Sequence, residues 1–159
     1  MSDEKFQQAN ELNIQPPHAL WLIKFVDIYQ RLSVDNLHLL AELYHQNITF
    51  IDPMHKLTGF EQLAHYFDGL YQQLSYCEFS IEQVIAEENE AAIYWNMSYQ
   101  HPRLNAGNVV HVQGSSHIRG DGDKVIFHRD YIDLGAMLYE QVPLLGRIIR
   151  FLKRRATNS

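Results

Sequence analysis

Residues 44–67, YHQNITFIDPMHKLTGFEQLAHYF, change their hydrophobic period at Pro53. Before the proline, residues 48–52 have the composition of a short strand, which ends there because proline cannot donate to a strand ladder. After the connection, apolar residues recur every three or four positions, which predicts an amphipathic helix. Thr58 and Glu61 have the spacing of a capping box at its start. The stretch predicts a strand, a tight connection and a helix.

The rest of the chain extends this pattern in both directions. The period is helical before the stretch and alternating after it, with an irregularity between Ile81 and Val84 and a glycine-rich turn at residues 120–123. In chain order, we expect helices 21–32 and 35–44, strand 48–52, helix 58–74, strands 79–85, 93–99, 109–118 and 124–131, and an amphipathic segment 138–155. Helices first and strands after predict an α+β fold. We expect a curved antiparallel sheet that forms a cone, three N-terminal helices that wrap it, and an extra C-terminal amphipathic helix.

Composition excludes several classes of protein. The chain of 159 residues is long enough for one domain, and its net charge of −6 argues against general nucleic-acid binding. The single cysteine, Cys77, cannot form an internal disulfide, the polar N-terminus is unlike a signal peptide, and no run would span a bilayer. We therefore expect a cytoplasmic protein with a flexible tail (1–15), a cone domain (16–135) and a basic amphipathic extension (136–159).

The order of elements and the quoted stretch resemble one known group of proteins. The features that match are Leu43-Tyr44 at a helix end, Asp52-Pro53 after a short strand, Thr58-Gly59 before an aromatic-rich helix, and the closing strand 124–131. Over residues 20–134 the chain resembles the SnoaL-like branch of the nuclear transport factor two-like superfamily, which includes ketosteroid isomerases, polyketide cyclases and limonene epoxide hydrolases. The resemblance implies a cavity inside the cone, no cofactor and a homodimer formed through the outer face of the sheet.

The resemblance also assigns roles to two polar positions. Asp52 matches the general base of the isomerases, which moves a proton between carbon atoms. The alternative is an Asp-Pro turn residue or a helix cap. The tyrosine and neutral aspartate of the isomerase oxyanion hole would fall near Ile28 and Ser115. The chain departs from the family pattern at both positions, although Tyr29 stands beside the first.

Residues 125–133, VIFHRDYID, supply the remaining ionisable candidates. Side chains alternate along a strand, so His128, Asp130 and Ile132 share one face. The resemblance turns that face into the cone, where Asp52, His128 and Asp130 would form an acid–base site with Asp52 as base and His128 as acid or orienting group. The alternatives are a His–Asp contact that only stiffens the wall, or the reverse orientation of the strand.

Further candidates are mostly aromatic. The predicted ligand-binding residues are Trp21, Phe25, Tyr29, Phe67, Tyr71, Trp95, Met97, Ser115 and Ile132, and simple core packing is the alternative for the aromatic ones. No metal site is expected, because His111 and His117 would lie about 20 Å apart along one strand and no HExxH spacing occurs. No glycine-rich phosphate loop and no GxSxG turn occur either.

The basic C-terminal segment has three competing interpretations. Five basic residues and one acidic residue lie between positions 138 and 159, a balance of +4 that leaves −10 for the rest of the chain. Leu138, Val142, Leu145, Ile149 and Leu152 form its predicted apolar side, interrupted near Pro143. The segment could cover the cone or a dimer mate, bind an acidic partner, or contact an anionic membrane through Arg147, Arg150, Lys153, Arg154 and Arg155.

Taken together, the residues and the resemblance predict a protein with a pocket for a small apolar molecule. If it is an enzyme, we expect proton transfer in an isomerisation, cyclisation or hydration, with Asp52 as the base. The alternative is a non-catalytic ligand-binding or protein-interaction module with the same fold.

Overall fold

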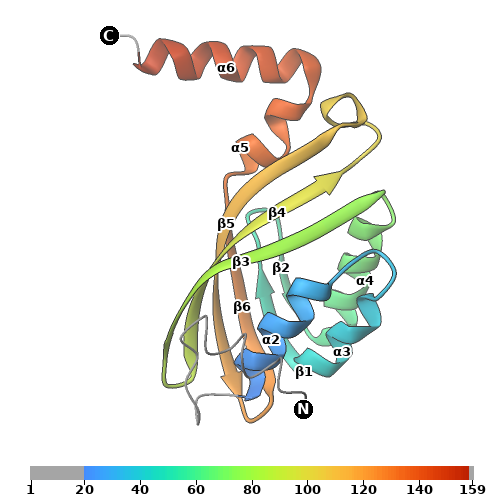
Figure 1. Ribbon diagram of the computed structural model, residues 1–159, viewed down its shortest axis with the longest axis vertical. Coiled ribbons are helices and arrows are strands. Elements are labelled where there is room, and N and C mark those ends of the chain that lie inside the picture. Colours follow the sequence, from blue (N-terminus) through green and yellow to red (C-terminus); the bar gives the residue numbers. More distant parts are fainter. Residues whose placement is uncertain (1–19, 158–159) are drawn as a thin grey trace.

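The computed structural model describes residues 20–157, so the predicted tail and residues 158–159 lie outside the described residues. Six strands form one curved sheet in the order β2-β1-β6-β5-β4-β3 (Figure 1). The strands are β1 (Tyr44–Ile51), β2 (Lys56–Thr58), β3 (Tyr76–Glu87), β4 (Glu90–Gln100), β5 (Val109–Asp121) and β6 (Lys124–Ile132). All neighbouring pairs are antiparallel except β1 and β6, which run parallel. The predicted α+β fold is confirmed.

Three helices pack against the concave side of this sheet (Figure 1). They are α2 (Leu20–Arg31), α3 (Leu40–Leu43), which follows the 3-10 turn η1 (Leu37–Leu39), and α4 (Phe60–Tyr71). Trp21 of α2 lies directly over Gly120, where a Cβ atom would come within 2.1 Å of the indole ring. The glycine is therefore required for this close approach of helix and strand.

Two local predictions in this region are wrong. The second helix does not reach Tyr44, because that residue already pairs with Val125 as part of β1. The predicted capping box does not form either. Thr58 ends β2, and Gly59 precedes α4 with φ of +92° and without a side-chain cap. Sheet pairing of the preceding residues outweighs both local helix signals.

The strand predictions agree more closely with the structure. A shift in the β3–β4 register between Ile81 and Gln83 confirms the predicted irregularity in the first long strand. The predicted turn before β6 is confirmed as well, with Gly122 in the left-handed region at φ of +59°. This bulge and turn help the long strands to curl around the helices.

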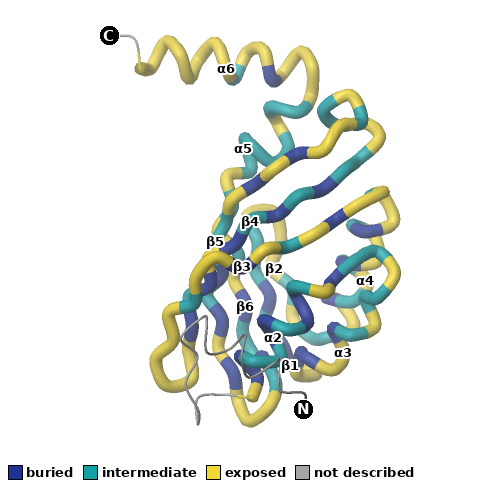
Figure 2. Tube along the Cα trace, viewed as in Figure 1, coloured by how far each residue is buried: buried dark blue, intermediate teal, exposed yellow. Residues whose placement is uncertain are grey.

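The C-terminal extension leaves the body of the fold. It comprises α5 (Leu134–Met137), which Asp133 caps by accepting a hydrogen bond from the Ala136 amide, the 3-10 turn η3 (Tyr139–Gln141), and α6 (Pro143–Thr157). Proline begins α6 instead of interrupting it, so two residues of the predicted apolar side, Leu138 and Val142, precede the helix. Figures 1 and 2 show α6 projecting beyond the cone with a largely exposed surface. No helix within residues 20–157 is long and apolar enough to cross a membrane.

Candidate functional site

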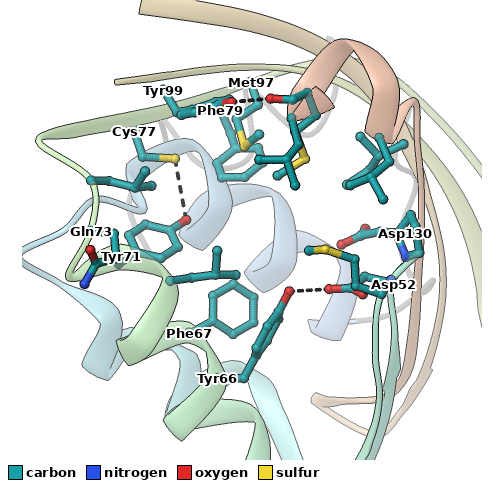
Figure 3. Close-up of a pocket in the computed structure, with 18 of the residues that line it drawn as sticks. Asp52, Tyr66, Phe67, Tyr71, Gln73, Cys77, Phe79, Met97, Tyr99 and Asp130 are labelled. Atoms are coloured by element: carbon teal, nitrogen blue, oxygen red, sulfur yellow. Dashed lines mark hydrogen bonds between the residues drawn. The ribbon is translucent and has the colours of Figure 1, made fainter. Parts of the chain in front are cut away.

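A cavity of about 580 Å³ lies inside the cone, between the concave face of the sheet, α4 and the start of the C-terminal extension. Its wall is mainly aromatic and aliphatic, as the side chains in Figure 3 show. The lining includes Tyr29, Phe50, Asp52, Tyr66, Phe67, Tyr71, Cys77, Phe79, Trp95, Met97, Tyr99, His101, Leu104, Ser116, Asp130, Ile132, Leu134, Met137 and Leu138. A cavity of this size suits a compact, largely apolar molecule.

Asp52 lines the cavity, but both of its carboxylate oxygens already accept hydrogen bonds. Oδ1 accepts from the backbone amides of Met54 and His55, at 2.7 and 2.6 Å, and so closes the turn around Pro53. Oδ2 accepts from the Tyr66 hydroxyl, and burial together with this carboxylate raises the pKa of Tyr66. Asp52 is therefore a turn residue and a cavity residue at once.

Asp130 is bonded differently. Its Oδ1 accepts from the Ser116 hydroxyl at 2.5 Å and lies 2.8 Å from Nε2 of His128. Within residues 20–157 no donor contacts Oδ2, and Figure 3 shows the carboxyl group pointing into the cavity. Asp130 thus keeps one oxygen available to a ligand.

The two carboxylates lie side by side. Phe50 pairs with His128 and Ile51 with Arg129 in the parallel β1–β6 ladder, so Asp52 and Asp130 follow at the next level of neighbouring strands. Adjacent strands are about 4.8 Å apart. Figure 3 shows both acidic groups on the same wall of the cavity.

A buried chain of hydrogen bonds continues behind Asp130. Nδ1 of His128 lies 2.6 Å from the Tyr44 hydroxyl, which lies 2.7 Å from the Tyr29 hydroxyl. Every group is satisfied when Tyr29 donates to Tyr44, Tyr44 donates to Nδ1, and the Nε2 proton of His128 points to Asp130. Burial raises the pKa of both tyrosines, so they remain proton donors at neutral pH.

Ser116 receives support from the neighbouring strand. Trp95 donates from Nε1 to the Ser116 hydroxyl at 2.8 Å, which leaves the serine proton for Asp130. The indole also lies over Gly114, where a Cβ atom would come within 2.3 Å of the ring. A glycine opposite the tryptophan is therefore part of the support of the site.

The predicted site residues fall into two groups. Asp52, Asp130, Tyr29, Phe67, Tyr71, Trp95, Met97 and Ile132 all line the cavity. Ser115 does not, because it pairs with Tyr94 and Tyr131 on the other face of the sheet, and Ser116 takes the inner position.

Trp21, Phe25 and His128 lie behind the lining. The Trp21 ring packs over Gly120, and the Phe25 ring stacks on Tyr29 with ring centroids 4.2 Å apart. His128, with 1% of its surface exposed, lies behind the cavity wall and hydrogen-bonds to the lining residue Asp130.

Three residues in the hydrogen bonds around the two carboxylates are not among the site residues predicted from the sequence. Tyr66 lies one position from the predicted Phe67, Ser116 one position from Ser115, and Tyr44 was assigned to a helix end. The strand parity that selects Trp95 also selects Ser116, once the β4–β5 register is known. Nothing in the sequence indicates the Tyr44–His128 contact, which depends on the parallel pairing of β1 and β6.

Tyr71 and Cys77 supply the polar groups of the opposite side (Figure 3). The Cys77 thiol donates to the Tyr71 hydroxyl at 3.7 Å, and no acceptor for the hydroxyl proton occurs among the described residues. Burial raises the pKa of Tyr71 well above its usual value. A neutral hydroxyl therefore faces the cavity as a hydrogen-bond donor. Residues 20–157 contain no group of three or more His, Cys, Asp or Glu placed to hold a metal ion.

The fold and the cavity define a cone-shaped protein with an internal pocket. Comparison with known families identifies the family to which it belongs. The profile of the SnoaL-like domain matches residues 25–128, and the chain belongs to this family. The resemblance seen in the sequence is confirmed. A comparison with curated proteins finds no match.

Solved structures with the same fold are distant in sequence. A protein assigned as a SnoaL-like polyketide cyclase from Jannaschia sp. CCS1 superimposes with a TM-score of 0.68 at 16% identity, over 78% of this chain and 92% of that one. A hypothetical protein with a ketosteroid isomerase-like fold from Catenulispora acidiphila, in complex with trimethylamine, gives a TM-score of 0.66 at 14% identity, over 81% of this chain and 94% of that one. An LEH-like epoxide hydrolase from M. tuberculosis gives 0.60 at 13% identity, over 74% and 79%. At such identities the likeness shows the fold alone.

Proposed function

We propose that the chain binds a compact apolar molecule in the cone cavity and transfers a proton on it, with Asp130 as the base. One observation carries this proposal. Oδ1 of Asp130 is held by Ser116 and His128, whereas Oδ2 faces an apolar cavity without a donor from residues 20–157. A base needs a free lone pair at the ligand and a fixed position, and Asp130 meets both requirements.

Asp52 fits the same role less well, although its position matches the family base. Two backbone amides and the Tyr66 hydroxyl already occupy its oxygens. A proton added there would disturb the turn at Pro53 and the contact with Tyr66. We assign Asp52 to shaping that wall of the cavity and to keeping Tyr66 in place.

His128 acts in this proposal as a positioning residue. Its Nε2–H fixes the Asp130 carboxylate, and the Tyr29–Tyr44 pair fixes its ring by donating to Nδ1. Tyr71 would donate to the oxygen on which negative charge develops when a carbon–hydrogen bond of the ligand breaks. The proton moves to Oδ2 of Asp130, and its return to another carbon of the ligand gives an isomerisation. If the carbanion first attacks a carbonyl carbon of the same ligand, a ring bond forms, the carbonyl electrons move to the oxygen, and the proton returns to that oxygen, which gives a cyclisation.

A second candidate is a binding protein without turnover. The complete hydrogen bonding of Asp52 favours it, because one of the two carboxylates is then purely structural. Both candidates keep the small-molecule ligand. They differ in whether Asp130 exchanges protons with it.

Deuterium incorporation from D2O into a cyclic ketone, 2-tetralone, separates these candidates. We expect exchange beside the carbonyl above the buffer rate, a loss of about 10²- to 10⁴-fold in Asp130→Asn, and a smaller loss in Asp52→Asn. Quenching of Trp95 fluorescence reports binding of the ketone in each variant. Binding without exchange would support the second candidate, and a complete loss in Asp52→Asn with normal Asp130→Asn would make Asp52 the base.

A homodimer through the outer face of the sheet remains part of the proposal. Tyr94 and Tyr131 are both exposed there, one on β4 and one on β6, and both pair with Ser115 between them. Arg129 lies over the Tyr131 ring at 4.9 Å. Aromatic and arginine side chains of this kind are common at protein interfaces.

A further inference from the structure

The C-terminal helix α6 carries an uncovered row of large apolar side chains. Leu144 is 71% exposed and Phe151 54% exposed. At 100° per residue, the row falls within an arc of roughly 120° on one side of the helix. The apolar stripe of α6 consists of Leu144, Leu145, Ile148, Phe151 and Leu152. A stripe of this kind on a soluble domain marks an interaction surface.

The remaining surface of α6 is basic. Arg147, Arg150, Lys153 and Arg154 lie outside the stripe, Arg155 lies in the last turn, and the helix contains no acidic residue. The basic side chains at the edges of the stripe have long aliphatic stems that can extend along an apolar surface while the charges stay in water. The partner of α6 should therefore be apolar in its interior and negative at its surface.

The junction with η3 holds α6 at a defined angle. Arg150 donates to the Glu140 carbonyl at 3.2 Å, and Lys153 donates to the Glu140 carboxylate. A Cβ atom on Gly146 would come within 2.2 Å of the same carbonyl, so only glycine allows this approach. Figure 2 shows α6 projecting from the cone, with nearly all of its residues exposed. The apolar stripe is therefore presented to the outside and does not close back on the sheet.

We propose that α6 is an anchor for an anionic phospholipid bilayer, lying flat at the level of the headgroups with its apolar stripe in the acyl boundary. Large amphipathicity, a basic polar side and apolar residues such as Phe and Leu are the properties of helices that bind in this plane. The fifteen residues span about 22 Å, less than the roughly 30 Å hydrocarbon core, so the helix lies on the bilayer and does not cross it.

Charge argues against a second copy of the chain as the occupant. Pairing two apolar stripes would place Arg147 and Arg154, which flank the stripe, at the edge of the contact in both helices. Arg155, which falls within the arc of the stripe in the last turn, would lie in the contact itself. Anionic headgroups neutralise these charges, whereas a second α6 adds to them.

The position of the anchor also indicates where a ligand comes from. This inference about the ligand, unlike the anchor itself, rests on the function proposed above. Leu134, Met137 and Leu138 line the cavity and lead directly into the anchor. Binding of α6 to a bilayer would bring this rim of the cavity close to the membrane. The ligand class would then be apolar molecules dissolved in, or released from, the bilayer.

Co-sedimentation of the full chain with phospholipid vesicles tests the anchor. We expect the protein to pellet with phosphatidylcholine vesicles that contain phosphatidylglycerol, to pellet little with phosphatidylcholine alone, and to be released by salt. Phe151→Glu should weaken binding by about tenfold or more, because a large apolar side chain leaves the acyl boundary. Replacing Arg147 and Arg154 by Gln should weaken it roughly fivefold per charge.

Ile85→Glu is the matched control, because Ile85 on β3 is also 54% exposed but lies far from the anchor in the sequence. It should bind vesicles like the wild type, and circular dichroism should show that all variants fold. Failure of the wild type to pellet with the anionic vesicles overturns the proposal. So does sedimentation-velocity evidence that Phe151→Glu converts a dimer to a monomer while vesicle binding is unchanged. Neither result depends on ketone exchange, so the anchor and the proposed chemistry fail separately.

Discussion

Apolar side chains are usually buried and ionisable side chains usually exposed. The last strand and the last helix of the chain depart from this rule in opposite ways. Strand β6 buries ionisable groups, with His128 only 1% exposed, and helix α6 exposes apolar ones, with Leu144 71% exposed. Buried polar residues and exposed apolar patches are the informative departures from that rule. In β6 the compensation lies within the fold, because Tyr44 bonds to His128, and His128 and Ser116 both bond to Asp130. In α6 no such compensation exists among residues 20–157, so its complement lies outside the described residues.

Breaking the internal compensation of β6 should give the largest change in stability. His128→Leu leaves the Tyr44 hydroxyl without its acceptor and Asp130 without one of its donors, and we expect a loss of about 3–5 kcal/mol in the free energy of unfolding. Urea unfolding measures it. His117→Leu is the control, because His117 lies on the outer face of β5 beside the exposed Glu90, and it should change stability by about 0.5 kcal/mol at most. A small effect of His128→Leu would mean that the buried chain contributes little.

The cone should also lose stability at alkaline pH, because it buries the Cys77 thiol. Burial raises the pKa of Cys77 from 9.0 to about 11. The folded protein keeps this proton where the unfolded chain has lost it, so the contribution is complete below pH 9 and is lost as the pH rises to about 11. Two pH units correspond to about 2–3 kcal/mol.

Urea unfolding at pH 8 and at pH 11 measures this loss in the wild type and in Cys77→Ala, which should lose less. The pKa of the buried Tyr29 and Tyr44 is also raised, so part of the alkaline loss should remain in the variant. Phe151→Ser on α6 should lose as much as the wild type. An equal loss in Cys77→Ala and the wild type would contradict the assignment to this thiol.

The sequence was sufficient to predict the order of helices and strands, because hydrophobic periodicity is a local property of the chain. Alternation and helical spacing located the long strands, and the Asp52-Pro53 step with the aromatic helix after it carried the family resemblance. The errors occur where distant pairing decides the outcome. Tyr44 has a helical neighbourhood in sequence but joins β1 because Val125 pairs with it. Thr58 has a capping spacing but belongs to β2.

Only those features of the site that follow from the alternation of side chains along a strand, or from the family resemblance, were predictable. Parity placed Asp130 and Ile132 on one face of the strand, and the resemblance turned that face toward the cavity and added Asp52. It could not show that both oxygens of Asp52 accept hydrogen bonds or that His128 lies behind the cavity wall, because both facts depend on contacts across strands and helices. The choice of Ser115 over Ser116 failed for the same reason, since one residue of register reverses the face.

A matched pair of phenylalanine substitutions compares the exposed helix α6 with the buried wall of the cone. The substitution on α6 should have the smallest effect on the free energy of unfolding. Phe151→Ser, at a position 54% exposed, should leave the free energy of unfolding within about 0.5 kcal/mol of the wild type. Phe50→Ser removes the same atoms from a site 2% exposed in the wall of the cone, and should cost about 3–5 kcal/mol. Chemical denaturation of both variants measures the difference. A loss above about 1 kcal/mol for Phe151→Ser would mean that the apolar stripe packs within the protein in solution. Contacts within the protein would then cover the stripe, as they satisfy the ionisable groups of β6, and a membrane would not be needed to explain it.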